Sequence, residues 1–155
     1  MLKRNLTEWA AIAEIIATVA VVVSLLFVAN TVSQNTRAVQ VQNDNFLYEL
    51  QFARAREISA NADLAEIYVK VINGDSLTEV ERTRFIWDKY QELSTWELAF
   101  NRHRDGLYSD ENWIGWDKYY QDFFLAQFPR DWWEEARIFY QQDFQEHVDA
   151  AYARK

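Results

Sequence analysis

The strongest constraint on this chain is a long apolar run, "WAAIAEIIATVAVVVSLLFVA", which extends from Trp9 to Ala29. Apart from Glu14 and two hydroxyl-bearing residues, every side chain in the run is apolar. As a helix, a run of this length spans about 30 Å, which matches the hydrocarbon core of a bilayer. The sequence therefore predicts a membrane anchor over residues 1–30, with a transmembrane helix at about 8–30.

A cleaved signal peptide is the competing interpretation of this run. It is disfavoured because the apolar stretch is too long and no small-x-small cleavage site follows it. Basic side chains set the expected orientation, since Lys3 and Arg4 precede the span and only Arg37 follows it closely. The positive-inside rule then predicts a cytoplasmic N-terminus and a C-terminal domain on the outer, periplasmic side.

The predicted helix continues beyond the membrane because no Gly or Pro occurs before Gly74. We expect a helical stalk over residues 31–60. Along it an apolar residue recurs every seven positions, a spacing suited to packing against another helix. This row comprises Leu25, Val32, Val39, Phe46 and Ala53.

Glu14 begins a second row at the same spacing, which continues through Val21, Val28, Asn35, Gln42, Glu49 and Arg56. A straight helix drifts about 20° per heptad, so this row stays on one face only if the helix supercoils with partners. In that case Glu14 points inward and a homo-oligomer has a ring of carboxylates at one membrane end. Alternatively, Glu14 extends its carboxylate to the nearby membrane interface.

Small residues on a neighbouring face, Ala17 among them, allow close approach of a second helix. The predicted interface, with other copies of the chain or with a larger membrane complex, therefore combines both heptad rows and this small-residue face. It consists of Glu14, Ala17, Leu25, Val32, Asn35, Val39, Gln42 and Phe46.

Residues 61–155 are predicted to form an acidic, aromatic-rich helical domain. Turn signals separate helices expected at about 63–72, 79–105, 110–127 and 130–152, and no stretch alternates like a strand. Asn61 or Asp63 is placed to cap the first, and Thr78 with Glu81 forms a capping box at the second. The predicted fold class is thus all-α: a transmembrane helix that continues into a stalk, followed by a small helical bundle.

Charge distribution limits the partners of this domain. The net charge of −8 lies entirely in residues 61–155, where 11 Lys and Arg face 19 Asp and Glu. This acidity argues against nucleic acid or anionic lipid as the main partner of the soluble part. The bilayer itself and other membrane proteins remain the expected partners.

Two observations bear on catalysis and ligand binding. The chain has no cysteine, only three glycines, and none of the phosphate-loop, nucleophile-elbow or zinc-protease motifs, so an enzyme is disfavoured and no cofactor is predicted. Asp143 and His147 are too few ligands for a metal site. The aromatic stripes favour a bulky core, although a pigment or quinone site between helices is conceivable.

Glu97 is the candidate buried acid of the domain because it lies between Leu93 and Phe100 on an apolar stripe. We expect it to pair with an arginine such as Arg56 or Arg104, since buried acids are usually paired. His103, close to the end of the same predicted helix, is expected to be exposed there.

The segments "AEIIATVAVVVSLLFVANTVSQNTRA", "ANADLAEIY", "LTEVERTRF", "WELAFNRHRDGLY", "ENWIGW" and "WWEEARIFYQQDFQEHVD" occur here in a specific order. In this the chain resembles a widespread bacterial family of small single-span membrane proteins with no established function. The resemblance covers nearly the whole chain and implies a bacterial inner-membrane location, but no activity, ligand or catalytic residue. Where members often have Pro, this chain has Ala62.

These observations predict a membrane-anchored, non-enzymatic assembly protein. Its transmembrane and stalk helix would oligomerise or dock on a larger membrane complex. Two alternatives stay open: a small homo-oligomeric pore with Glu14 as its acid ring, and a membrane-anchored helical protein that binds a ligand or pigment.

Overall fold

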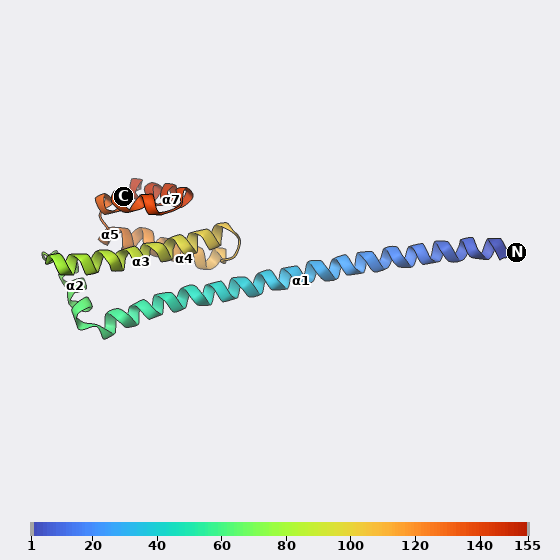
Figure 1. The fold of residues 1–155 in the computed structure, drawn as a ribbon, viewed down its shortest axis with the longest axis horizontal. Helices are drawn as coiled ribbons and strands as arrows, with labels where there is room; N and C mark the ends of the chain where they lie inside the picture. Colours follow the sequence, from blue (N-terminus) through green and yellow to red (C-terminus); the bar gives the residue numbers. More distant parts are fainter. Residues whose placement is uncertain (1, 155) are drawn as a thin grey trace. The chain divides into compact units, whose positions relative to one another are not determined.

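The computed structural model describes residues 2–154, with side chains from Asn5 onward, and these residues contain no strand. The all-α prediction is confirmed for this part of the chain. Figure 1 shows the order of the elements. They are α1 (Leu2–Ala60), α2 (Ala62–Asn73), α3 (Glu79–Arg104), α4 (Asp110–Tyr119), the π-helix η1 (Tyr120–Phe124), α5 (Leu125–Gln127), α6 (Arg130–Ala136), the 3₁₀-helix η2 (Arg137–Phe139) and α7 (Gln142–Ala153).

The chain divides into two units, residues 1–39 and residues 40–155. The first unit is the N-terminal part of α1, and all of its described side chains are exposed. By length and composition, α1 is the one helix of the described chain that could cross a membrane. Lys3 and Arg4, which carry the prediction of orientation, lie outside the described side chains.

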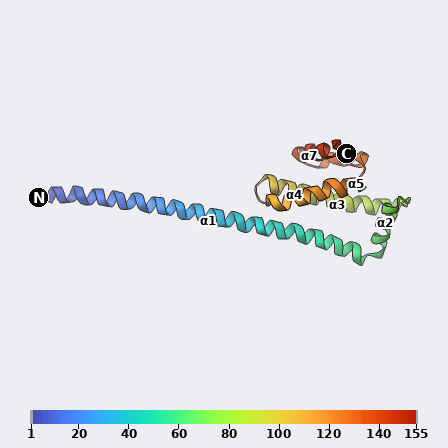
Figure 2. The ribbon, with the colours of Figure 1, turned by 180° about the vertical axis from the view of Figure 1, so that it is seen from behind.

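The second unit begins with residues 40–60 of α1, which run antiparallel to α3. The side-chain amide of Gln40 donates to the carbonyl oxygen of Gly106 (2.8 Å), and that of Asn43 donates to the carbonyl oxygen of Leu107 (2.9 Å). Within this unit, Figures 1 and 2 show α2 joining this part of α1 to the returning α3. Most of the segment expected as a stalk, residues 40–60 of 31–60, therefore belongs to the helical unit.

Local signals in the sequence set the ends of α2 and α3. The side-chain oxygen of Asn61 accepts from the Leu64 N–H at the start of α2, and α2 ends at Gly74, whose φ of 75° suits glycine. Thr78 and Glu81 form the predicted capping box of α3, in which each side chain accepts a backbone N–H of the other residue. Both capping predictions are confirmed.

The core of the second unit is built around Trp96 of α3, which has no exposed surface. Its ring stacks on Tyr120 at 5.0 Å between centroids and meets the Phe144 ring of α7 edge-on at 5.4 Å. Its indole N–H donates to Asp117 (2.9 Å). A buried indole removes a large apolar area from water, and its N–H needs a hydrogen-bond acceptor, which Asp117 provides here. Trp96 therefore packs α3 against α4, η1 and α7.

Two expected helices are interrupted. The predicted helix 110–127 contains the π-helix Tyr120–Phe124, and the predicted helix 130–152 breaks after the 3₁₀-helix Arg137–Phe139. At the break, Tyr140 is extended and the Gln141 N–H donates to the Glu97 carboxylate (2.7 Å). This tertiary hydrogen bond satisfies a backbone donor that a continuous helix would use internally, and it stabilises the break.

Candidate functional site

The residues predicted as an oligomer or partner interface are all exposed. In the first unit these are Glu14, Ala17, Leu25, Val32, Asn35 and Val39, and in the second unit they are Gln42 and Phe46. Phe46 retains 41% exposure although the guanidinium of Arg102 lies 4.8 Å from its ring centroid. The face of α1 to which Phe46 belongs is therefore largely unused by the chain's own helical unit.

Glu97 is not the buried acid of the domain. It is half-buried and accepts the backbone N–H of Gln141, so it holds the start of α7 and pairs with neither of the arginines expected. Arg104 instead meets Asp105 and Asp143. The prediction for Glu97 is therefore corrected. The buried carboxylate is Glu92, which lies five positions earlier on α3 and is 3% exposed.

Glu92 belongs to a cluster of four charged side chains between α1 and α3. Arg54 of α1 donates to both oxygens of Asp88 (2.7 and 3.1 Å) and lies 2.8 Å from Glu92. Burial disfavours the charged guanidinium, but Asp88 and Glu92 outweigh this and raise the pKa of Arg54. Burial likewise opposes ionisation of Asp88, yet hydrogen bonds from Arg54 and Tyr68 leave its pKa below the ordinary value.

Lys89 supplies the second cation of the cluster and is only 2% exposed. Its ammonium donates to Glu92 (3.1 Å) and to the side-chain oxygen of Gln127 (3.0 Å). The rings of Tyr68, Phe85 and Phe124 surround it with centroids 5.1 to 5.4 Å away. Burial lowers the pKa of Lys89, Glu92 opposes the shift, and the net direction is downward.

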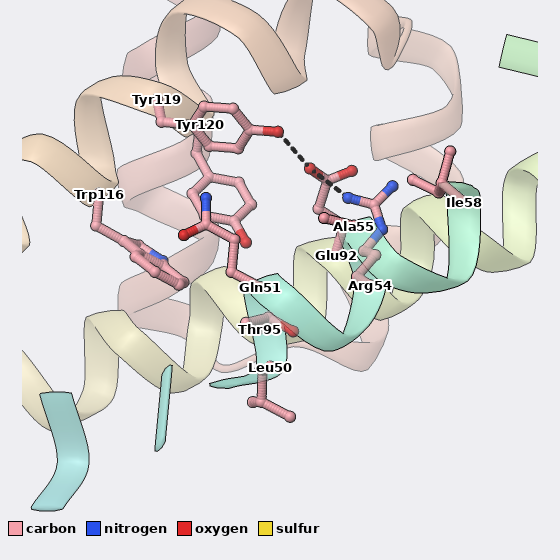
Figure 3. A pocket seen from close by; sticks show the side chains of 10 residues that line it. All are labelled: Leu50, Gln51, Arg54, Ala55, Ile58, Glu92, Thr95, Trp116, Tyr119 and Tyr120. Atoms are coloured by element: carbon pink, nitrogen blue, oxygen red, sulfur yellow. Dashed lines mark hydrogen bonds and ion pairs between the residues drawn. The ribbon is translucent and has the colours of Figure 1, made fainter. Parts of the chain in front are cut away.

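The cluster forms one wall of a pocket of about 180 Å³ between residues 50–58 of α1, α3, α4 and η1 (Figure 3). Arg54 and Glu92 reach this wall, and the Tyr119 hydroxyl donates to Glu92 (3.1 Å). Burial, followed by the negative charge of Glu92, raises the pKa of Tyr119 to about 12. Tyr119 therefore stays protonated at neutral pH and keeps donating to Glu92.

Trp116, Tyr119 and Tyr120 line this pocket with the i, i+3, i+4 spacing of one helix face, and a π-helix begins at Tyr120. Tyr119 is the last residue of α4 and Tyr120 the first of η1, and the N–H of Leu125 donates to the carbonyl oxygen of Tyr120, five residues back. The wider turn changes the direction of successive side chains relative to an α-helix. Single-turn π-helices are frequent at functional sites, so the pocket is the candidate site of the second unit.

Neither histidine contributes to the pocket or to a metal centre. His147 is hydrogen-bonded to Asp117 (2.7 Å), while the ring of His103 stacks on Trp113 at 4.9 Å between centroids. Between residues 2 and 154, no three side chains of the metal-binding types come together. His103, expected to be exposed, is partly covered by this stacking.

The charges of the cluster balance. Arg54 and Lys89 are positive, Asp88 and Glu92 are negative, and each is in contact with a group of opposite sign. A mutually paired carboxylate or ammonium is a poor general base or nucleophile because its charge is already engaged. The charged wall of the pocket is therefore suited to binding a ligand through directed hydrogen bonds and complementary shape.

The sequence pattern does not predict this cluster because two charged residues interrupt the buried apolar stripe of α3. The buried stripe runs through Phe85, Lys89, Glu92, Trp96 and Ala99, with the three-and-four spacing of a helix face. An apolar search skips Lys89 and Glu92 and favours the neighbouring row instead. The available signal was the spacing of Lys89 and Glu92, which suits an ion pair at i, i+3 inside an aromatic stripe.

The two sites thus differ in kind: an exposed helical face on α1, and a small pocket with a charge-balanced wall in the second unit. No family model, no curated protein and no solved structure matches this chain.

Proposed function

We propose that this chain is a single-span membrane protein whose helix α1 anchors a non-enzymatic assembly domain. The observation that carries the proposal is that α1 is long and apolar enough to cross a membrane while its described side chains in residues 5–39 are all exposed. Exposed apolar surface costs about 25 cal/mol per Å² in water, and a bilayer removes this cost. The helix α1 continues from the proposed anchor into the helical unit without an interruption in its sequence range.

The exposed heptad rows of α1 support a role in assembly. Leu25, Val32 and Val39 remain exposed, and so does Phe46, where the helical unit packs on another face of α1. A regular apolar row next to the amides of Asn35 and Gln42 suits another helix better than lipid or water. The partner is another copy of the chain or a helix of a larger membrane complex.

The proposed location is the inner membrane of a bacterium, with the helical domain on the periplasmic side. The family resemblance supports the membrane, and the basic residues before the span support the orientation. The acidic character of residues 61–155 favours a protein partner over nucleic acid.

Membrane extraction tests the anchor. Full-length protein should stay in the pellet when membranes are washed with alkaline carbonate. Replacing Val21 and Val22 by Lys places two charges near the middle of the span, at a cost of roughly 2.5–3.5 kcal/mol each, and should release the protein. The matched control, Val41→Lys, adds a charge outside the apolar run and should leave the pellet fraction unchanged. Release of the unmodified protein by carbonate would remove the anchor from the proposal.

Disulfide cross-linking tests assembly, because the chain has no cysteine of its own. We expect Asn35→Cys and Gln42→Cys to cross-link under oxidation in native membranes, and Ser33→Cys, on a different face, to remain uncoupled. A product of twice the chain mass indicates self-association, and a larger mixed product that contains another protein indicates docking. Uncoupled chains at all three positions, together with a single-chain mass after mild extraction, would contradict assembly.

Cation conduction distinguishes the assembly protein from the pore. If purified oligomers conduct cations in planar bilayers and Glu14→Gln abolishes the selectivity, the pore replaces the assembly protein. A non-conducting oligomer retains the proposal.

A further inference from the structure

The pocket of the second unit has the construction of a small binding site, and its chemistry is independent of the membrane anchor. Its volume of about 180 Å³ is below the roughly 300–1,000 Å³ of drug-sized sites, and a cavity of about 150 Å³ accommodates one benzene ring. Leu50, Ala55 and Ile58 line it from α1, opposite the rings of Trp116 and Tyr120. Its size and these surfaces suit a ligand with a single ring.

The charge balance of the wall selects an uncharged ligand. Arg54 is engaged by Asp88 and Glu92, and Glu92 also accepts from Lys89 and Tyr119. A charged ligand loses its hydration on entry and needs an opposite charge that is free to pair with it. The pocket wall has no such free charge among the described residues, because its cation and its carboxylate are already paired with protein groups.

One donor in the pocket lining is buried without a partner. The indole nitrogen of Trp116 is buried without a hydrogen-bond partner, in a residue that is 7% exposed. The hydroxyl-bearing ring of Tyr120, a residue that is 4% exposed, also lines the pocket. A buried N–H without a partner is destabilising, so a ligand oxygen that accepts from it is favoured.

The side chain of Gln51 lies beside the rings of Trp116 and Tyr120 in the lining of the pocket (Figure 3). Gln51 is an exposed residue of α1. Moving one exposed side chain costs little, so Gln51 can turn away and admit a ligand oxygen to the indole N–H.

From this geometry we propose that the pocket binds a small, uncharged, one-ring carbonyl compound, whose oxygen accepts from Trp116 and Tyr120 while its ring packs on Leu50, Ala55 and Ile58. Trp116, Tyr119 and Tyr120 lie on one helix face at the start of the π-helix and form this side of the site. Tyr119 and Glu92 keep the polar wall rigid, so the site is formed before the ligand enters.

Three probes of similar size separate the parts of this proposal. Acetophenone carries the ring and the carbonyl, ethylbenzene carries the ring alone, and benzoate adds a negative charge. The full chain in detergent micelles, labelled with ¹⁵N at tryptophan, reports on seven indole N–H groups at once. Trp116→Phe assigns the signal of Trp116, and Trp9, in the anchor, reports whether a probe merely enters the micelle.

We expect acetophenone to shift the Trp116 signal downfield in a saturable manner while the Trp9 signal follows only detergent partitioning. Ethylbenzene should bind about tenfold more weakly and without the downfield shift, since one hydrogen bond contributes about 1.4 kcal/mol or less. Benzoate should not bind. Tyr120→Phe should weaken acetophenone several-fold, and the exposed control Trp87→Phe should leave its affinity unchanged.

Two results would overturn the proposal. In the first, acetophenone and ethylbenzene act equally on Trp116, which would leave no role for the carbonyl. In the second, the Trp116 N–H is already hydrogen-bonded in the free protein and Gln51→Ala abolishes that bond, which would mean that Gln51 satisfies the donor internally. The binding measurements use the unmodified chain, and if Trp116→Phe misfolds, sequential assignment of the indole signals identifies the Trp116 signal in its place.

Discussion

Within residues 40–60, α1 has one face that packs against the rest of the helical unit and one face that is exposed. One face carries Asn43, Leu47, Leu50 and Arg54, which contact the rest of the helical unit. The other carries Gln42, Phe46, Glu49, Ala53 and Arg56, all of which are exposed. The residues of the predicted heptad rows are therefore not the residues through which α1 packs against the rest of the helical unit.

Both faces have the spacing of a helix stripe. On the packed face, residues 43, 47, 50 and 54 are separated by four, three and four positions. On the exposed face, residues 42, 49 and 56 recur every seven positions, and so do residues 46 and 53. The inner face is selected by its partners: Leu47 is fully buried, and Arg54 meets two carboxylates of α3. Apolar content alone does not distinguish the faces, since the outer one carries the larger Phe46.

Arg54 and Arg56 form the sharpest test of this difference. Arg54→Ala should lower the free energy of unfolding by about 4 kcal/mol, because it leaves Asp88 and Glu92 buried without their shared cation. Arg56→Ala, on the exposed face, should change it by less than about 0.5 kcal/mol. Urea unfolding of the full chain in micelles, followed by near-ultraviolet circular dichroism, measures both. Equal effects would mean that the charge cluster does not hold α1 to α3.

Leu47 and Phe46 test the apolar parts of the two faces. Leu47→Ala should cost about 3 kcal/mol because it opens a cavity in the core. Phe46→Ala should cost about 1 kcal/mol or less, since its main intramolecular contact is the guanidinium of Arg102. In the membrane the order reverses, because Phe46→Ala should weaken cross-linking at Gln42→Cys while Leu47→Ala leaves the outer row intact. A larger unfolding effect at Phe46 would place the core on the wrong face.

Acid should destabilise the contact of the inner face. The pKa of Asp88 is lowered in the folded state, so its contribution is fully present above the unfolded value of about 3.9 and is lost as the pH falls through the folded value. The free energy of unfolding should therefore decline as the pH drops below about 4. Asp88→Asn should flatten the decline, and the exposed control Glu49→Gln should leave it unchanged. An identical pH profile for the two variants would remove Asp88 from the acid response.

Asn43 and Gln42 carry the smallest expected difference. Asn43→Ala removes the hydrogen bond to the Leu107 carbonyl and should cost about 1 kcal/mol. Gln42→Ala should alter the free energy of unfolding by less than about 0.5 kcal/mol and affect only assembly. The same urea titrations measure the pair, and a greater loss at Gln42 would contradict the assignment of faces.

Sequence reasoning succeeded where the physical cause is local. The caps at Asn61 and Thr78 depend on side chains that reach their own helix, and the long helix α1 depends on the absence of Gly and Pro. It failed where the cause is distant. Glu97 accepts the backbone N–H of Gln141, which is 44 positions away and lies at the break before α7. Arg54 donates to Asp88, which is 34 positions away.

The sequence by itself determined that the chain is helical, that α1 is apolar enough for a bilayer, and where α2 and α3 begin. The tertiary structure alone decided which face of α1 packs inward, that Glu92 and Lys89 are the buried charges, and that Tyr119 and Tyr120 line one pocket with residues of α1 and α3. The physical reason is that helix propensity and capping act over one turn. A buried charge is tolerated only where a group of opposite charge pairs with it. Here those groups come from distant segments, and no local sequence pattern specifies which of them will pair.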